Sequence, residues 1–369
     1  MKIVDVETIK LAAPLKEPWR IANIEFNTMY SNIVKVTTDE GYVGIGESLV
    51  RFAPDATHSI IQELKPVLIG KDPFDIESLW EKMFSIMRSR GHSKGFMIEA
   101  ISGVDIALWD LIGKVLKLPV YKLLGGCFRE RIEVYASSLL FKNTDVLVKE
   151  AIELVDEGFT SIKLKIGRNS ETDIKNVKTI RDALGYNIKL MVDANGAYGF
   201  HTALKLGRKL ERYEVYWFEE PLPPYDTHNY VKLSEKLDIP IAAGESEFTR
   251  YGFRDLLVSK AVNIIQPNVS RAGGLSECKK IATMASAFNI PYAPHTGASS
   301  SVCIVASLHL AACIQNFLIF EYMYPPNPLK DELLLKPAFK LKDGYITVPT
   351  KPGLGIELNE NTISKYQKT

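Results

Sequence analysis

Several features that mark other classes of protein are missing from this 369-residue sequence. Its formal net charge is only +1, which gives no reason to expect nucleic acid or an acidic membrane surface as a partner. No apolar run approaches the roughly 20 residues that cross a bilayer, and the N-terminal stretch MKIVDVETIK lacks a basic region followed by an apolar signal core. We therefore expect a cytoplasmic protein with neither a nucleic-acid partner nor a membrane partner.

Cysteine is scarce as well. The four residues occur without any CxxC spacing, and two of them lie in an apolar helical stretch where buried free thiols are usual, which again favours a reducing cytoplasm. The hydrophobic fraction of 46% and the charged fraction of 24% are those of an ordinary globular protein. The length suffices for a barrel domain of about 250 residues and a second domain of roughly 100. The cysteines are Cys127, Cys278, Cys303 and Cys313.

Three carboxylates stand at the ends of short apolar segments rich in β-branched residues: Asp193 in LMVDANG, Glu219 in WFEEP and Glu245 in IAAGES. A helix-like segment follows each of them, which is the pattern of a parallel βαβ series. Glu219 follows Asp193 by 26 residues, and Glu245 follows Glu219 by the same number. The carboxyl ends of parallel strands meet at the mouth of a (β/α)8 barrel, where such barrels keep their active sites. We predict that the three acids converge there; the alternative is three unrelated helix N-caps.

Three converging carboxylates would repel one another unless a cation lies between them. A hard divalent cation with oxygen ligands meets that need, and because the set has neither Cys nor His, we predict Mg²⁺ rather than Zn²⁺. Lys163 and Lys165 end the preceding strand SIKLKIG, and their spacing of two places both on one face. A partly desolvated lysine near a divalent cation has a lowered pKa and can serve as a general base. The alternative is a pair of solvated lysines at a strand end.

Three further residues end predicted strands at the same mouth. His295 ends PYAPH, nearly opposite Lys165 in an eight-stranded ring, although a lone histidine in such a place can also be structural. Asn268 ends the neighbouring strand, and we expect it to accept the imidazole N–H and hold the ring in one tautomer. Glu321 ends FLIFE and is a candidate for an acid or for a substrate-binding group.

The fold class predicted from these periodicities is α/β, with a (β/α)8-type, modified TIM barrel and an N-terminal α+β capping domain that the C-terminal segment completes. We expect the capping domain at residues 1–125, the barrel at 126–325, and a C-terminal segment at 326–369 that packs back on the cap through a hairpin. Within the cap, residues 14–27 read as a polar, proline-bearing loop, either functional or disordered, between the first two strands. A helical pattern runs from residue 54 to about 118. The predicted barrel strands are 131–137, 161–166, 189–193, 215–219, 240–245, 262–267, 291–295 and 317–321, each but the last followed by a helix.

Taken together, these motifs resemble the mandelate racemase subgroup of the enolase superfamily. The motifs are KxK at 163–165, DxN at 193–195, EEP at 219–221, GE at 244–245 and PH at 294–295. The segments IIQPNVSRAGGLSE, GVDIALWDLIGKVLKLPVYKLLGG and PGLGI support the resemblance. The resemblance therefore covers nearly the whole chain. It implies that Asp193, Glu219 and Glu245 are the Mg²⁺ ligands, with Glu219 rather than Glu220 because the first acid of that motif is the family ligand.

The resemblance also implies roles for other residues. Lys165 would be a general base, Lys163 would contact the substrate carboxylate, and Asn195 would line the pocket beside the metal. The loop around Trp19 and the segment 51–56 would close over a small-molecule acid-sugar substrate. A homo-oligomer, either a dimer or an octamer, is implied as well.

One position departs from the family pattern, because Asn268 stands where the family usually has Asp. Without that negative charge the imidazolium of His295 is stabilised less, so the histidine becomes a weaker base and a stronger acid. Such a group suits proton donation to a departing hydroxide. A racemase, which needs a competent base on each face of the substrate, is favoured less.

The segments WFEEPLPPYD, AAGESEFTRYGFRDLL and QPNVSRAGG look most like those of acid-sugar dehydratases. The expected reaction is a Mg²⁺-dependent dehydration of an aldonate, such as arabinonate, gluconate or galactonate. It would remove the proton α to the carboxylate, pass through an ene-diolate, and give a 2-keto-3-deoxy acid. The alternatives are a racemase or epimerase of a 2-hydroxy acid, and a barrel that binds an acid sugar or forms a structural oligomer without turnover.

Overall fold

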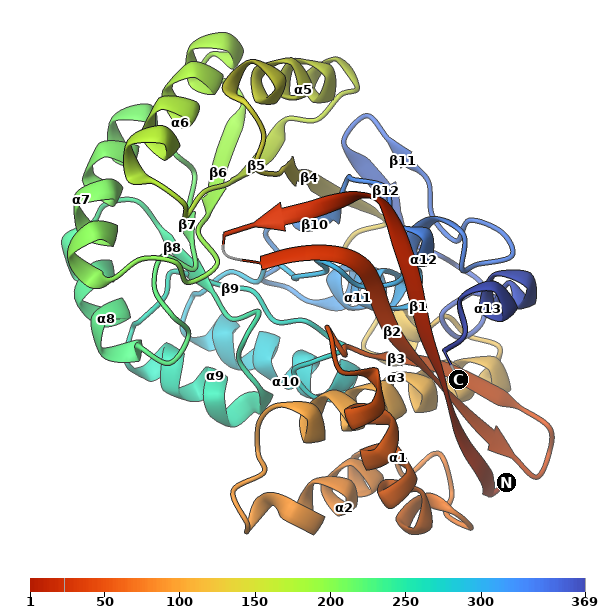
Figure 1. Cartoon of the computed structure of the whole chain (residues 1–369). Coiled ribbons are helices and arrows are strands. Elements are labelled where there is room, and N and C mark those ends of the chain that lie inside the picture. The colour runs from red at the N-terminus through yellow and green to blue at the C-terminus, as the bar shows by residue number, and fades with distance from the viewer. Residues whose placement is uncertain (23, 369) are drawn as a thin grey trace.

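A computed structural model describes residues 1–22 and 24–368 of the chain. It has two main bodies, a three-stranded sheet with helices on one side and a ring of parallel strands surrounded by helices (Figure 1). Within the described residues, none of the helices combines the length and the apolar character needed to span a bilayer.

The N-terminal body is an antiparallel sheet in the order β1-β2-β3 with three helices packed against it. The third of these helices is apolar almost all round, and it lies directly on β3 because Gly44 and Gly46 leave no side chain in between. A Cβ atom at Gly46 would lie 2.0 Å from the carbonyl oxygen of Gly103. The elements are β1 (Ile3–Ile21), β2 (Ile24–Thr38), β3 (Val43–Ser48), α1 (Pro54–Leu68), α2 (Ile76–Arg88) and α3 (Phe96–Leu116).

Strands β1 and β2 form a much longer hairpin than the sequence predicted. Residues 14–27, predicted as a loop, continue both strands, with Trp19 paired to Phe26; Asn23 within that segment lies outside the described residues. The pairing register shifts after Pro14. Prolines are tolerated there because β1 is an edge strand, whose outer N–H groups need no partner. The loop prediction was therefore wrong.

Eight parallel strand positions close the barrel. Strands β4 to β9 follow one another in the sheet, and β10 pairs in parallel with β4. The seventh predicted strand is reduced to single parallel bridges at Tyr292, one to Ile265 and one to Phe317. The strands are β4 (Arg131–Leu139), β5 (Ser161–Lys165), β6 (Lys189–Asp193), β7 (Phe218–Glu219), β8 (Ile241–Ala243), β9 (Ile264–Ile265) and β10 (Phe320–Met323).

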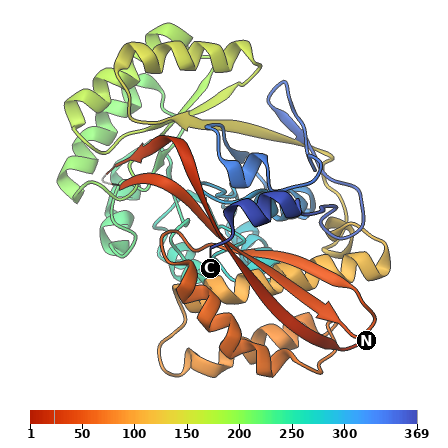
Figure 2. The ribbon, with the colours of Figure 1, turned by 45° about the vertical axis from the view of Figure 1, so that its right-hand side comes forward.

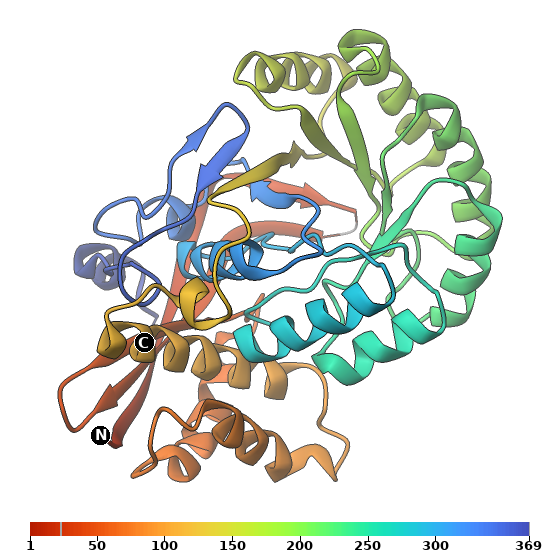
Figure 3. The same cartoon turned by 180° about the vertical axis from the view of Figure 1, so that it is seen from behind.

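Helices follow the first seven barrel strands and surround the ring, as the view from behind shows (Figure 3). The last strand is followed only by the four-residue α12 (Pro328–Asp331), in agreement with the prediction that no helix follows it. The helices that come after α3 and before α12 are α4 (Val120–Leu123), α5 (Thr144–Asp156), α6 (Ser170–Leu184), α7 (Phe200–Leu210), η1 (Glu211–Tyr213), α8 (Thr227–Lys236), α9 (Thr249–Val258), α10 (Gly274–Ala287) and α11 (Ser301–Cys313).

An apolar plug fills the interior of the barrel. Met191 precedes Asp193 by two residues and Trp217 precedes Glu219 by two, and in a strand such pairs point to the same face. The plug therefore lies one layer below the acids at the strand ends. Its buried members are Tyr135, Met191, Trp217, Ala242, Ile264, Ala293 and Ile319.

The C-terminal segment contacts both bodies. The predicted hairpin turn at 342–344 is present, but its second strand pairs with β4 of the barrel rather than with the cap. Farther on, the backbone N–H of Leu354 donates to Asp110 on α3 at 2.8 Å, and Gln367 bridges to Leu11 of β1. The last helix lies beside the first sheet (Figure 2). Because of these shared contacts, domain boundaries at 125 and 325 stay a prediction. The elements are β11 (Leu341–Lys342), β12 (Tyr345–Thr347) and α13 (Glu360–Tyr366).

Candidate active site

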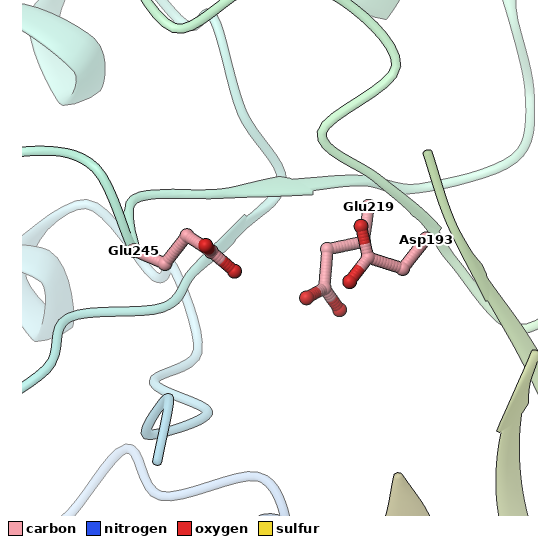
Figure 4. A group of neighbouring side chains, drawn as sticks. All are labelled: Asp193, Glu219 and Glu245. Carbon is pink, nitrogen blue, oxygen red and sulfur yellow. The ribbon is translucent and has the colours of Figure 1, made fainter. Parts of the chain in front are cut away.

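The structure brings the three predicted acids together. Asp193 and Glu219 end β6 and β7, and Glu245 follows β8. Each offers one carboxylate oxygen, and these three oxygens lie within 4.8 Å of one another in a buried cluster. Glu245 approaches from its own side, with its carboxylate directed toward the other two (Figure 4).

The acids fit a hard divalent cation. Glu245 Oε2 is buried and, within the described part of the chain, receives no hydrogen bond. A buried polar atom without a partner is costly. Burial and the neighbouring charge of Asp193 raise the pKa of Glu219 to about 8, which shows the strain of holding like charges together. A cation with oxygen ligands would satisfy the free oxygen and offset that repulsion.

Lys163 is buried beneath the acids. Its Nζ donates to Glu219 Oε1 at 2.6 Å and to Glu321 Oε1 at 2.9 Å, and it lies over the ring of Tyr135 at 5.2 Å from the centroid. Burial alone would lower the pKa of Lys163, but the two carboxylates outweigh it and raise that pKa well above its usual range. The two carboxylates therefore favour the ammonium form of Lys163.

Lys165 lies at the rim of the same cluster and is less buried. Its Nζ donates to Asp193 Oδ2 and, at 3.0 Å, to Asn195 Oδ1. Asn195 has a φ of 44°, and its backbone N–H donates to Asp193 Oδ1 at 2.9 Å, so a tight turn fixes both partners of Lys165. Burial would raise the pKa of Asp193, but Lys165 and Lys163 outweigh it and lower that pKa to about 2.

Asn268 contacts His295 with the polarity opposite to that expected. Its Nδ2 lies 3.1 Å from His295 Nδ1, while its Oδ1 accepts the backbone N–H of Ser270 at 2.8 Å. Because that N–H needs the amide oxygen, the amide NH₂ faces the imidazole. Nδ1 must then accept, which leaves the ring hydrogen on Nε2. Burial also lowers the pKa of His295, so the ring is neutral near pH 7.

The far side of the imidazole faces two acids. His295 Nε2 lies 3.2 Å from Glu245 Oε2 and 3.8 Å from Glu321 Oε2. Glu321 Oε2 also accepts both backbone N–H groups of residues 296–297. Burial would raise the pKa of Glu321, but Lys163 and His295 outweigh it and lower that pKa. A lowered pKa fits the role of a proton donor poorly, and the substrate-binding role of Glu321 stays a prediction. Its carboxylate also accepts from Lys163 and from the turn after His295.

Sequence reasoning missed two residues that support the acids. Trp217 Nε1 and Gln266 Nε2 donate to Glu219 Oε2 at 3.0 and 2.8 Å. The alternation of side chains along a strand could have predicted both, because Trp217 precedes Glu219 by two residues and Gln266 precedes Asn268 by two, which places each pair on one face. The neighbouring acid Glu220 is also buried, and it lines a separate small cavity together with Pro224 and Tyr230.

Trp19, predicted to bind substrate, is buried in the hairpin of β1 and β2. It lines a cavity of about 560 Å³ together with Phe141 and Tyr324. Among the described residues that line this cavity, none is an acid of the cluster formed by Asp193, Glu219 and Glu245. The end of the hairpin rests on the rim of the barrel, where Arg168 Nε donates to the carbonyl oxygen of Ala22 at 3.3 Å. A role for Trp19 in binding stays a prediction.

The polarity of the Asn268 contact leads to a testable expectation. In Asn268→Asp, a carboxylate would face Nδ1 and stabilise a hydrogen there, so the pKa of His295 should rise. Nitrogen chemical shifts of the imidazole, followed against pH, should report the higher pKa and a change of the Nδ1 atom from acceptor to donor. Ser299→Ala, which removes a hydroxyl 3.5 Å from Asn268 Nδ2, is the matched control. An unchanged titration in Asn268→Asp would contradict the assignment.

Comparison with known proteins places the chain in a family. Residues 3–125 match the mandelate racemase / muconate lactonizing enzyme N-terminal domain, and residues 146–362 match the enolase C-terminal domain-like family. The arabinonate dehydratase of Saccharolobus solfataricus is 36% identical over 374 residues, which cover 99% of this chain and 99% of that protein.

Solved structures agree with this placement. The 3,6-anhydro-D-galactonate cycloisomerase of Zobellia galactanivorans is 36% identical, with a TM-score of 0.92 and full coverage of both chains. A racemase from Streptomyces coelicolor A3(2), solved with bound magnesium, is 27% identical, with a TM-score of 0.91 over 99% of this chain and 100% of that one. The chain belongs to the mandelate racemase / muconate lactonizing enzyme family of the enolase superfamily, as its motifs predicted.

Proposed function

We propose that this protein is a Mg²⁺-dependent acid-sugar dehydratase that converts an aldonate to a 2-keto-3-deoxy acid. The observation that carries the proposal is the chemical difference between the two groups beside the acid cluster. Lys165 contacts Asp193 at one end of the cluster, and His295 contacts Glu245 at the other. One is an amine at the rim, and the other is a neutral imidazole that presents Nε2–H. Such a pair suits an elimination, in which one group takes a proton and the other assists a leaving oxygen.

Asp193, Glu219 and Glu245 would hold the Mg²⁺. When bound, the ion supplies positive charge against the substrate carboxylate and the ene-diolate derived from it. Lys163 would add a second positive charge beside the same acids, since its Nζ donates to Glu219 and Glu321. A homologous structure with bound magnesium supports the choice of metal.

Lys165 would take the proton from the carbon next to the carboxylate. It contacts the acid cluster directly, and Asn195 and Asp193 orient its Nζ. The electron pair left on that carbon forms the new carbon–carbon double bond as the hydroxyl on the next carbon departs. His295 would hydrogen-bond that oxygen through Nε2–H and keep its hydrogen, because Nδ1 carries none. The departing hydroxide becomes water with the proton that Lys165 took, which returns Lys165 to its free amine. The enol that remains tautomerises to the 2-keto acid.

Racemisation fits the same residues less well. It needs a base on each face of the substrate, whereas His295 carries its hydrogen on Nε2 because Asn268 donates to Nδ1. A histidine in that tautomer offers the substrate a donor and not a lone pair. Racemase or epimerase activity on a 2-hydroxy acid is therefore the weaker candidate.

A second candidate comes from the similarity to the cycloisomerase of Zobellia galactanivorans. Elimination of a ring ether oxygen would use the same α-proton abstraction, but the leaving oxygen would stay attached to the substrate. The product would then be an isomer of the substrate and would not have lost water. Lys165 and His295 would keep the roles described above.

One screen separates these activities. The purified protein with Mg²⁺ is offered a library of aldonates and anhydro-aldonates, and 2-keto acids are trapped with semicarbazide and weighed by mass spectrometry. A product lighter than its substrate by one water is expected. A keto acid of unchanged mass would replace dehydration with cycloisomerisation, and exchange of the α-hydrogen in D₂O without a keto acid would favour racemisation.

The remaining expectations are proposed as the sequence and the family resemblance predicted them. They are a homo-oligomer, either a dimer or an octamer, a cytoplasmic location, and a capping domain that ends near residue 125. Light scattering of the purified protein would decide the first. A monomer that turns over its substrate at full rate would refute it.

A further inference from the structure

We infer that Glu47 is a positioning residue for His295. It fixes the first turn of α11, and through it the turn after His295, so that Nε2–H is held where it meets the leaving oxygen. The inference rests on the proposed function, because the step that it concerns is the departure of that oxygen. It gives the capping domain a part in the reaction at a residue that is fully buried between the cap and the barrel.

Glu47 lies near the end of β3 and is completely buried. Its Oε1 accepts the backbone N–H of Ser300 at 2.9 Å, and its Oε2 accepts the Ser300 hydroxyl at 2.6 Å and the backbone N–H of Cys303 at 2.8 Å. Ser31, on the neighbouring β2, donates to Oε1 at 3.1 Å. A carboxylate of the cap therefore binds N–H groups that the first turn of a barrel helix leaves free, where the helix dipole favours a negative charge.

This contact tolerates little displacement. Every donor that the described part of the chain offers to Glu47 is a neutral hydroxyl or a backbone N–H. Burying a carboxylate is costly unless hydrogen bonds satisfy it. A shift of Ser300 or Cys303 away from Glu47 would leave a buried charge without its donors. The cap and the start of α11 are therefore held in a narrow range of relative positions.

The turn between His295 and α11 is held at both ends. At its start, Glu321 Oε2 accepts the backbone N–H groups of residues 296–297, and at its end Glu47 holds the first turn of α11. Between the two anchors, Ala298 has a φ of 55°, a conformation that is uncommon for a residue with a side chain. Backbone of this kind persists only where its surroundings hold it in place.

The same turn lies directly against the imidazole. A Cβ atom at Gly297 would lie 2.8 Å from His295 Nε2, so the backbone there closely borders the nitrogen that carries the hydrogen. Helix α11 also approaches the other partner of the ring, since Cys303 Sγ lies 3.6 Å from Asn268 Oδ1. A displaced turn would therefore move Nε2–H relative to the acid cluster. Lys165 would keep its place, because residues of other strands bind its Nζ.

The two steps of the reaction should consequently respond differently to the loss of Glu47. Proton removal by Lys165 should continue, whereas the oxygen should depart more slowly because the hydrogen bond from His295 is misplaced. The ene-diolate would then more often take a proton back from Lys165. In D₂O the protonated amine exchanges its hydrogens with the solvent, so the returned hydrogen is deuterium. Recovered substrate should accordingly carry deuterium on the α-carbon.

The test compares Glu47→Gln with the wild-type enzyme in D₂O, on the aldonate that gives the highest turnover. The substitution keeps the size of the side chain but replaces one acceptor oxygen with an NH₂ group, which cannot accept an N–H of α11. Keto-acid formation should fall roughly 10- to 100-fold with little change in KM, as expected for a reacting group displaced by about 1 Å. The ratio of deuterium uptake to keto-acid formation should rise by about the same factor.

Two further variants keep the test decisive. Ser300→Ala is milder, because it removes the hydroxyl that donates to Glu47 but keeps the backbone N–H, and it should shift the ratio in the same direction by a smaller factor. Glu277→Gln is the matched control, since this acid is also fully buried but lies on α10 and binds Arg250 of α9. It should unfold at a lower denaturant concentration than the wild type and leave the ratio unchanged.

A purely structural role for Glu47 would give a different result. Keto-acid formation and deuterium uptake would then fall in parallel in Glu47→Gln, at the ratio of the wild type, and this outcome would overturn the inference. An unchanged rate of keto-acid formation would overturn it as well. If the wild type forms no keto acid from any acid sugar, the proposed function fails and the inference with it, whereas a failure confined to Glu47→Gln leaves the proposed function standing.

Discussion

Replacing Lys165 with alanine is expected to lower kcat by about 10²- to 10⁴-fold, the usual contribution of a general base. Lys165 contacts both Asp193 and Asn195 at the rim of the cluster, where a substrate α-proton can reach its Nζ. The loss should fall on proton abstraction itself, so exchange of the substrate α-hydrogen with D₂O should decline in parallel with keto-acid formation. Both are measured on the same sample, the first by proton NMR and the second by semicarbazide trapping.

The neighbouring lysine provides a sharp contrast. Lys163→Ala removes the cation between Glu219 and Glu321, which would leave two buried carboxylates without their partner. Breaking such a buried ion pair costs about 3–5 kcal/mol, so that variant should unfold at a lower denaturant concentration. Lys165→Ala should lower its unfolding midpoint less, because Asp193 keeps Lys163 at 3.5 Å. Lys178→Ala, exposed on α6, is the control for both. Wild-type turnover in Lys165→Ala would remove this residue as the base.

Chelation is expected to abolish turnover, and added Mg²⁺ should restore it. The physical reason lies in the acid cluster, where three buried carboxylates share one small space. In Glu245→Gln, one ligand charge is lost at the position of the oxygen that has no hydrogen bond. Mg²⁺ affinity, measured by calorimetry, should fall more than about 100-fold, since residues outside the ligand set alone are worth 10- to 100-fold.

A nearby acid gives the matched control for this prediction. Glu247 stands two residues after Glu245 but pairs with Lys94 at 2.8 Å, away from the cluster. Glu247→Gln should bind Mg²⁺ as the wild type does. Full activity after exhaustive dialysis against EDTA would contradict the metal assignment, and so would equal Mg²⁺ affinity in the two variants.

Much of the candidate site could be predicted because parallel strands place their ends at one edge. Asp193, Glu219 and Glu245 were identified from their position after apolar segments and their even spacing, and the structure brings them together. The same rule located Lys163 and His295. Strand alternation, applied further, would also have identified Trp217 and Gln266.

Three features differ from the prediction or were not predicted. The pairing of Trp19 with Phe26 outweighs the local preference of a proline-bearing stretch for a loop. The amide of Asn268 is turned by a backbone N–H at Ser270, which no side-chain pattern reports. Arg51 reaches Gly297 across 246 positions of sequence. The contact of Arg51 depends on how distant segments pack, whereas the other two features arise within one hairpin and within one short turn.

The layering of the barrel bears on how such a protein can change its chemistry over generations. Met191, Trp217, Ala293 and Ile319 support the fold from one level, while the residues two positions later along each strand lie at the mouth, around the acid cluster. At the upper level, Glu219 and Lys163 contact Trp217 and Tyr135 of the plug. Substitutions that spare these two residues leave the lower level intact, so they can alter the reaction without weakening the scaffold. This separation makes the chain a favourable starting point for laboratory evolution, in which libraries limited to the upper level would retain a high proportion of folded members.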